Sequence, residues 1–371
     1  MEIGRYLKIM VDKNASDLYF STSAPVNIKV EGVTSRLDEH IMPPGAVKKI
    51  AYALMNSEQV KTFEKNWEMD IAISATNIGR FRVNIFKQRG EVSMVVRYIS
   101  AIIPSIDELN LPTILQELVV EPNGLILVVG ATGSGKSTTL ASMISHRNHH
   151  KTGHILTIED PIEYIHQHHQ SIVNQREIGL DTHSYEDALK RAMREAPDVI
   201  MIGEIRDRET MQQAIAYSET GHLCLSTLHA SNANQTMERI VNFFPESSYR
   251  QLCMDLSMNL RAVISQRLIV GKDGKRIPAI EILLNTPHIQ DLILKGEINM
   301  INEAMEQNTE SGMQTFDQAL YKLYVEGKID EKEALNHADS QNNLSLRIRL
   351  ARNGQTNLPN GLTIDKNEPF R

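Results

Sequence analysis

The sequence is poor in cysteine and has no long apolar run. Its only cysteines, Cys224 and Cys253, form no Cys-x-x-Cys pair, which excludes a disulfide framework and a cysteine-based zinc site. We expect both to be small, buried, reduced side chains. The first ten residues lack the apolar segment of a signal peptide, and residues 125–130 are far shorter than a membrane span of about 20 residues. These absences predict a cytoplasmic protein that reaches a membrane only through partners.

An excess of positive charge is also missing. The chain has 39 Lys and Arg against 46 Asp and Glu, which gives a formal net charge of −7. This balance argues against a protein that coats nucleic acid, and it disfavours a DNA-pumping ring because no nucleic-acid motif is present. A hydrophobic content of 41% is ordinary for a globular protein, and 371 residues suffice for two domains of roughly 100–200 residues each.

Residues 1–100 are predicted to form a mixed α/β domain, and residues 101–122 a linker. The segment 46–65 has the apolar spacing of a helix, and the linker contains prolines and one short helical pattern. The strand-like runs of this first domain lie at 17–20, 27–31, 69–75 and 79–86.

Residues 123–350 are predicted to form a second α/β domain. Short apolar strands alternate there with helical patterns, which is typical of βαβ units and a mainly parallel sheet. Residues 351–371 are polar and rich in Asn, Gly and Pro, so we expect a disordered tail. The predicted strands of the second domain lie at 125–129, 155–158, 199–202 and 223–227.

The sequence GATGSGKS at residues 130–137 matches the P-loop pattern G-x-x-x-x-G-K-[ST], and it lies between a strand-like run and a helical pattern. The glycines let consecutive backbone N–H groups turn toward phosphate oxygens, and the following helix adds the partial positive charge of its N-terminus. We expect Lys136 to reach the β- and γ-phosphates of ATP and the Ser137 hydroxyl to ligate Mg²⁺. The predicted nucleotide-binding residues are Gly130, Ala131, Thr132, Gly133, Ser134, Gly135, Lys136, Ser137 and Thr138.

An apolar strand that ends in a carboxylate follows at residues 199–204, with the sequence VIMIGE. This arrangement is typical of a Walker B strand. Glu204 could hold the water shell of Mg²⁺ and polarise an attacking water, which suits hydrolysis. Without the P-loop upstream, the alternative of a buried strand whose terminal glutamate is merely solvated would carry more weight.

Two further segments are less generic. The sequence TIEDPIEY at residues 157–164 places Glu159, Asp160 and Glu163 at a strand end. The sequence TGHLCLSTLHA at residues 220–230 places His222 and His229 at the two ends of a buried strand, where their odd spacing directs them to opposite faces. They are therefore no simple metal pair; one could sense the γ-phosphate while the other supports the strand.

These four segments, in this order, resemble the Walker A, Asp, Walker B and His boxes of the secretion ATPase superfamily, and within it the type IV pilus retraction ATPases of the PilT/PilU family. Residues 14–21, 79–90 and 315–324 extend the resemblance over nearly the whole chain. It implies a PAS-like N-terminal α+β domain, a RecA-like P-loop ATPase domain and a homohexamer that binds ATP and Mg²⁺ at domain or subunit seams. It also implies work at the cytoplasmic face of the inner membrane, on a pilus platform protein and beside a PilT-type ATPase.

The resemblance assigns roles to single residues. Glu204 matches the Walker B glutamate that is thought to activate water, Glu163 matches the Asp-box glutamate, and His229 matches the histidine near the phosphates. Arginines of the N-terminal domain serve as phosphate sensors in such motors. Among the candidates here, we expect Arg82 and Arg97, rather than Arg89, to have this role.

Two departures refine the prediction. With two lone cysteines the chain lacks the tetracysteine site that extension and type II secretion ATPases usually have. Residues 285–297 also replace the Ala-Ile-Arg-Asn motif of PilT-type members, which favours the accessory PilU type. We therefore expect an ATP-hydrolysing motor that powers or assists pilus retraction. The alternatives are an ATP-binding regulatory ring with little hydrolysis of its own, and a P-loop kinase, for which no acceptor pocket or Arg-rich lid is visible.

Overall fold

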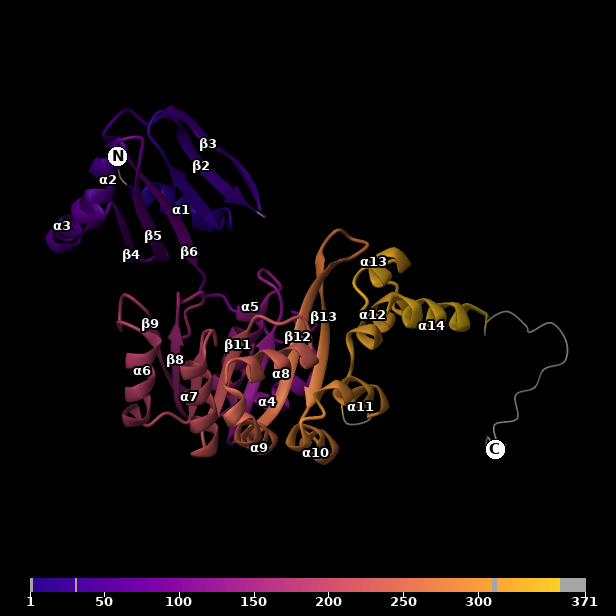
Figure 1. The fold of residues 1–371 in the computed structure, drawn as a ribbon. Helices are drawn as coiled ribbons and strands as arrows, with labels where there is room; N and C mark the ends of the chain where they lie inside the picture. Colours follow the sequence, from indigo (N-terminus) through magenta and orange to yellow (C-terminus); the bar gives the residue numbers. More distant parts are fainter. Residues whose placement is uncertain (1–2, 31, 309–311, 354–371) are drawn as a thin grey trace, which may run out of the picture. The chain divides into compact units, whose positions relative to one another are not determined.

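The computed structural model describes residues 3–30, 32–308 and 312–353, and its helices and strands fall into two compact units (Figure 1). Unit 1 comprises Met1–Pro104 and Lys151–Pro197, and unit 2 comprises Ser105–His150 and Asp198–Arg371. Unit 1 thus takes a second segment from within the predicted ATPase domain, and the domain limits drawn from the sequence stay a prediction. The last helix reaches Asn353, and the rest of the predicted tail lies outside the described residues.

Unit 1 contains a six-stranded sheet in which every neighbouring pair is antiparallel, in the order β3-β2-β1-β6-β5-β4. The second segment of unit 1 contains a parallel strand pair, β8–β9, which is not part of this sheet, and a helix. The elements of unit 1 are α1 (Ile3–Asp12), β1 (Asp17–Phe20), β2 (Pro25–Val30), β3 (Val33–Ile41), α2 (Ala46–Leu54), α3 (Ser57–Asn66), β4 (Glu68–Ala75), β5 (Gly79–Gln88), β6 (Glu91–Ile99), β8 (Gly153–Glu159), β9 (Ser171–Glu177), α6 (Tyr185–Ala192) and the 3₁₀ turn Met193–Glu195.

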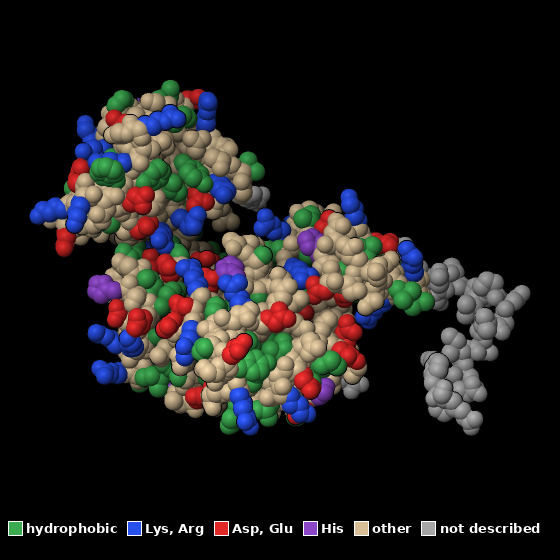
Figure 2. Space-filling model, in the orientation of Figure 1, with side chains coloured by type: hydrophobic (Ala, Val, Ile, Leu, Met, Phe, Trp, Pro, Cys, Tyr) green, Lys and Arg blue, Asp and Glu red, His purple; other side chains and the backbone are tan. Residues whose placement is uncertain are grey.

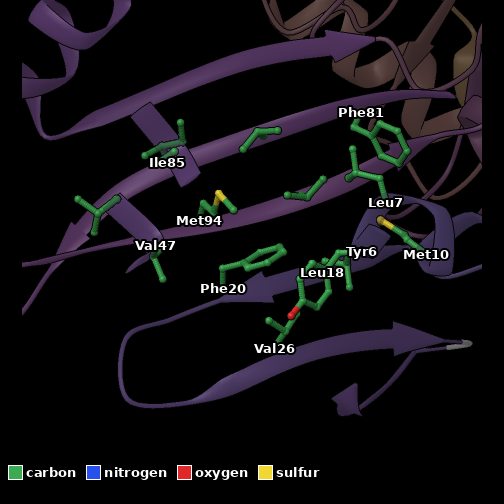
Figure 3. Packing of buried hydrophobic residues seen from close by; sticks show 14 of the residues in the cluster. Tyr6, Leu7, Met10, Leu18, Phe20, Val26, Val47, Phe81, Ile85 and Met94 are labelled. Atoms are coloured by element: carbon green, nitrogen blue, oxygen red, sulfur yellow. The ribbon is translucent and has the colours of Figure 1, made fainter. Parts of the chain in front are cut away.

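A hydrophobic core fixes which way the strands of this sheet face. Along β5 the residues Phe81, Val83 and Ile85 are buried, and the polar residues between them point to the other face, as the period of two in a strand requires. Figure 3 shows Tyr6, Leu7 and Met10 of α1 among the strand residues of this core, with the Tyr6 ring edge-on to Phe20 at 5.4 Å between centroids.

The single helix predicted for residues 46–65 is wrong in one respect, because the structure has two helices there. The first ends at Leu54, and Asn56 then caps the second: its side chain accepts hydrogen bonds from the backbone N–H groups of Glu58 and Gln59. The Gln59 side chain in turn accepts from the Asn56 N–H, which completes a capping box. The apolar spacing hid this break, although the Asn-x-x-Gln signature marks it.

Unit 2 contains a mainly parallel sheet in the order β13-β12-β7-β11-β10. The pairs β12–β7, β7–β11 and β11–β10 are parallel, and only β12–β13 is antiparallel. The elements of unit 2 are α4 (Ile114–Val119), β7 (Gly124–Val129), α5 (Lys136–His150), β10 (Val199–Ile202), α7 (Arg208–Glu219), β11 (Leu223–Leu228), α8 (Ala233–Asn242), the 3₁₀ turn Glu246–Ser248, α9 (Tyr249–Asn259), β12 (Leu260–Val270), β13 (Arg276–Leu284), α10 (Pro287–Lys295), the 3₁₀ turn Ile298–Met300, α11 (Ile301–Gln307), α12 (Phe316–Val325), α13 (Glu331–Asn336) and α14 (Gln341–Asn353).

Helices cover this sheet and explain its apolar strands. Every residue of β7, β10 and β11 is buried, which matches the continuous apolar runs that the sequence shows. Helices α5 and α7 pack against β7 and β11, and α8 packs against β12 and β13. The α/β class with a mainly parallel ATPase sheet is thus confirmed, and both cysteines are buried and free, as expected.

The C-terminal helices of unit 2 form a small core of their own. Phe316, Leu320 and Ile348 are buried there together with Ile269 of β12. None of the helices in the described part of the chain combines the length and apolar character that a membrane crossing requires. On the face drawn in Figure 2, acidic and basic side chains are intermixed over the surface of each unit.

Candidate nucleotide site

Three parallel strands of unit 2 end at the same edge of the sheet. In the register of these strands Leu228 pairs with Val129, and Ser226 pairs with both Leu127 and Ile202. The carboxyl ends of β7, β11 and β10 therefore lie side by side, which is where open α/β sheets bind ligands. The P-loop follows β7, the Walker B segment follows β10 and the His box ends β11.

The P-loop folds tightly between β7 and α5. Gly130, Gly133 and Gly135 all have positive φ, at 154°, 78° and 89°. The Ser134 N–H donates to the Ala131 carbonyl at 3.2 Å, and α5 starts at Lys136, the residue that the motif predicts to reach phosphate. The loop thus leads directly into the N-terminus of a 15-residue helix, where an anion is favoured.

Lys136 is buried and folds back over this loop. Its ammonium donates to the Gly130 carbonyl and to the Ala131 carbonyl, both at 2.9 Å. A buried cation held against a glycine-rich loop at a helix N-terminus fits a phosphate group. The fit is supported by the Ser134 hydroxyl, a buried group with no hydrogen-bond partner within the described residues.

The neighbouring strand β12 closes the loop from behind. A Cβ atom added to Gly130 would meet the backbone oxygen of Gln266 at 2.5 Å, so a larger residue has no room there. The Gln266 side chain is buried and accepts a hydrogen bond from the Thr139 hydroxyl at 2.7 Å. Sequence reasoning missed Gln266, because nothing in the motif pattern connects it with a helix more than 120 positions away.

Glu204 and His229 meet at this edge. Their Oε1 and Nε2 atoms lie 2.9 Å apart, and the Arg206 Nε donates to the other carboxylate oxygen of Glu204 at 2.8 Å. The Glu204 side chain is 16% exposed, so water can reach it. A partly exposed carboxylate held by two partners can orient a water molecule and accept its proton.

Hydroxyl groups of β11 fix the end of the Walker B strand. Ser226 donates to the Ile202 carbonyl at 2.8 Å and Thr227 donates to the Gly203 carbonyl at 2.6 Å. The Ile205 N–H returns a bond to the Thr227 carbonyl at 2.9 Å. These bonds fix Gly203 and Ile205, the residues on either side of Glu204. His222, at the opposite end of β11, lies beside Thr220 and Tyr217 instead.

A pocket of about 610 Å³ adjoins the phosphate loop in unit 2. Its lining includes Gly135 and Thr138 of the loop and α5, together with Leu268, Ile277 and Pro278. Its volume is that of an ordinary small-molecule site, and its walls combine apolar side chains with polar ones. This composition suits a nucleoside.

The Asp-box residues belong to unit 1. Burial raises the pKa of Glu159 to about 7, although its carboxylate accepts hydrogen bonds from the Thr157 hydroxyl at 2.6 Å and the Gln175 amide at 3.1 Å. Glu163 is exposed, and its backbone hydrogen-bonds the Glu159 carboxylate. Glu159 therefore stabilises this turn, whereas the predicted role of Glu163 at the nucleotide stays a prediction.

Arg82 and Arg97 lie directly opposite each other in the register of β5 and β6. The Arg82 guanidinium contacts Asp70 at 3.5 Å and the buried Glu177 at 3.8 Å, while the Arg97 Nε donates to Asp17 at 2.9 Å. The two arginines thus share one face of the unit 1 sheet. Their role as phosphate sensors stays a prediction.

Arg80 is a neighbour that sequence reasoning missed. It lies two residues before Arg82 in β5, on the same face, and its buried Nε has no hydrogen-bond partner among the residues that the structure describes. Its charge also acts on Glu177: burial raises the pKa of that carboxyl, and Arg82 and Arg80 partly oppose the rise. The alternating sequence GRFRVN could have indicated it.

Comparison with known proteins places the chain among secretion ATPases. Residues 2–276 match the family described as Type II/IV secretion system protein. The chain is 52% identical over 370 residues to the type IV pilus ATPase PilU of Pseudomonas aeruginosa, covering 98% of this chain and 97% of that protein. It is 39% identical to the type IV pilus retraction ATPase PilT of the same organism, over 91% of this chain and 98% of that protein.

A solved structure is also similar. The crystal structure of the pilus retraction motor PilT with bound ADP superposes with a TM-score of 0.88 at 40% identity, over 93% of this chain and 99% of that chain. Relatedness therefore extends over both units of the chain and is not confined to the P-loop.

Proposed function

The chain belongs to the Type II/IV secretion system protein family, and we propose that it is a Mg²⁺-dependent ATPase of the PilU type that powers or assists type IV pilus retraction. The observation that carries the proposal is that the P-loop with Lys136 and the Glu204–His229 pair follow neighbouring parallel strands at one edge of the sheet. The P-loop thereby provides for phosphate binding, and the neighbouring Glu204–His229 pair provides for activation of water.

ATP binding uses the P-loop. On binding, Lys136 exchanges the two loop carbonyls for phosphate oxygens, and the N-terminus of α5 holds the rest of the charge. The pocket beside Thr138 and Leu268 takes the nucleoside. When bound, Mg²⁺ would neutralise charge on the phosphates, and the Ser137 hydroxyl would hold it, since hydroxyl and carboxylate oxygens suit this hard cation.

Hydrolysis relies on Glu204. Its carboxylate orients a water molecule and takes up a proton as the water attacks, and the bonds from Arg206 and His229 keep it in place. His229, whose side chain is 39% exposed, is the residue that we assign to sense the phosphate end of the ligand. The products are ADP and phosphate.

The motor function rests on relatedness and on the unit 1 arginines. A homohexamer in which Arg82, Arg97 and Glu163 contact the nucleotide would close and open as ATP binds and is cleaved, because only a ligand that contacts two states differently can drive a change between them. The partners proposed are a PilT-type ATPase and an inner-membrane pilus platform protein, with the ring at the cytoplasmic face of that membrane. The higher identity to PilU than to PilT supports the accessory type.

A regulatory ring that binds ATP without cleaving it is the second candidate. The intact Glu204–His229 contact at 2.9 Å favours turnover instead. Phosphate release by the purified protein, measured at its native oligomeric size with and without Mg²⁺, separates the two. Mg²⁺-dependent turnover in a hexamer supports the motor. Nucleotide binding without turnover favours the regulatory ring. Full turnover by a monomer contradicts the proposed homohexamer.

A further inference from the structure

Three consecutive residues of β12 contact opposite sides of the unit 2 site. The Gln266 side chain points toward α5 and accepts a hydrogen bond from the Thr139 hydroxyl. Ser265 and Arg267 point to the other face of the strand, as its period of two requires. The Ser265 hydroxyl donates to Glu281 of β13 at 2.8 Å, and Arg267 extends to the segment that follows His229.

This segment, residues 229–233, is anchored at two points. The Arg267 guanidinium donates to the Ser231 carbonyl at 3.3 Å, two residues after His229. The buried Glu281 carboxylate accepts from the Ala233 N–H at 2.6 Å, where α8 begins. The position of His229 is therefore set by β12 and β13 as well as by its own strand.

Arg267 makes shorter hydrogen bonds to the residues around α12–α14 than to Ser231. It donates to the His337 carbonyl and to the Asp339 carboxylate, both at 2.6 Å, and its guanidinium carbon lies 3.8 Å from the centre of the Phe316 ring. Asp317 accepts the N–H groups of Asp339 and Ser340, which fixes the turn before α14. Arg267 thus links the core of α12–α14 to the segment after His229.

Only a guanidinium fits this position. It is planar, stacks on an aromatic ring and donates to several acceptors in fixed directions, whereas a lysine ammonium is a single point charge on a flexible stem. The Arg267 side chain is 22% exposed, so its bonds are partly shielded from water. Replacing it by lysine would keep the charge and release Ser231, Asp339 or both.

We propose that Arg267 is a positioning residue for ATP hydrolysis: by holding Ser231 against Asp339 and Phe316, it keeps His229 in contact with Glu204. The inference rests on the proposed ATPase function. It makes the C-terminal helices α12–α14 part of the machinery that sets the turnover rate, since any movement of their core shifts the anchor of His229.

Arg267→Lys tests the proposal in the full-length protein. We expect kcat for ATP to fall about tenfold to a hundredfold, the cost of a misplacement near 1 Å in a catalytic group, while the Kd for ADP stays unchanged. The decisive readout is a double-mutant cycle with His229→Ala. If Arg267 acts through His229, the lysine substitution has no further effect on kcat in the His229→Ala background.

Controls separate the possible results. Lys295→Gln removes another ion pair of unit 2, at 2.6 Å to Asp291, and should retain the wild-type kcat. Where Arg267→Lys does not fold, Asp339→Asn makes the same test with the same expected sign. An unchanged kcat, or an equal loss with and without His229, overturns the positioning role alone. A wild-type protein that binds ATP without turnover overturns the proposed ATPase function, and this inference with it.

Discussion

The phosphate loop and the Glu204–His229 pair lie at one edge of the same sheet, yet they are built differently. The loop is local: Lys136 bonds to carbonyls five and six positions away, and glycines supply the backbone angles. The pair joins residues that follow two different strands. It is held by the hydroxyls of β11 and, from β12 and β13, by Arg267 and Glu281.

The difference separates two kinds of substitution. A change in the loop alters the affinity for phosphate directly, because the loop makes the binding groups itself. A change around the pair should alter the geometry of hydrolysis more than binding, because the pair supplies none of the P-loop groups that bind phosphate. Affinity and turnover should therefore respond to different residues, and the following variants test that division.

Glu204→Gln should have the largest effect. Glutamine keeps the size of the side chain but cannot take up a proton, so we expect kcat to fall about 10²- to 10⁴-fold with nucleotide affinity retained. Steady-state phosphate release and ATP titration measure the two quantities. Glu209→Gln, at an exposed position of α7, is the matched control. Turnover of Glu204→Gln at the wild-type rate would falsify the assignment of Glu204 as the base.

Glu281→Gln should change how stability depends on pH. Burial raises the pKa of Glu281 to about 7, with Asp339 adding to the rise and Arg267 opposing it. The folded state thus holds a proton that the unfolded state releases near pH 4.5. The free energy of unfolding should fall as pH rises from about 4.5 to about 7, by on the order of 3 kcal/mol from this carboxyl.

Glutamine cannot titrate but can still accept the Ala233 N–H and the Ser265 hydroxyl. Urea unfolding between pH 5 and pH 8 should therefore show a smaller fall for Glu281→Gln than for the wild type, while the exposed Glu306→Gln should show the wild-type fall. An identical pH dependence in Glu281→Gln and wild type would mean that Glu281 is ionised in the folded protein, and that its support of α8 has another basis.

The same division explains what the sequence could predict. The P-loop, the Walker B strand and the strand at 17–20 follow from residues within one short segment, so pattern and glycine positions suffice. The supports of His229 depend on β12 and β13, whose antiparallel pairing leaves no motif. Gln266 becomes visible only when the fold brings α5 beside β12. Arg267 and Glu281 become visible only when residues 231–233 and 337–339 reach the paired strands β12 and β13.

Lys136→Ala should act on binding. Loss of a charged donor to phosphate costs about 1.5–3 kcal/mol, so we expect the affinity for ADP and ATP to fall roughly 10- to 150-fold. Fluorescence titration with a labelled nucleotide measures it. Lys332→Ala, exposed on α13, should bind as the wild type does. Unchanged affinity in Lys136→Ala would mean that the phosphates bind elsewhere. The distinction between a loop that sets affinity and a pair that sets turnover would then fail.

The smallest expected effect is a difference in stability between two glycine substitutions, and it tests whether the phosphate loop depends on β12. Gly133 and Gly135 both have positive φ, so alanine strains the backbone at either position. A Cβ atom at Gly133 meets nothing within 4 Å, whereas one at Gly135 lies 2.7 Å from the Gln266 amide nitrogen of β12. We therefore expect Gly135→Ala to unfold at lower urea concentration than Gly133→Ala, by about 1 kcal/mol. Equal stabilities would mean that the Gln266 side chain moves aside at little cost and that the loop is independent of β12. The expected gap would show that β12 constrains the phosphate loop through Gln266.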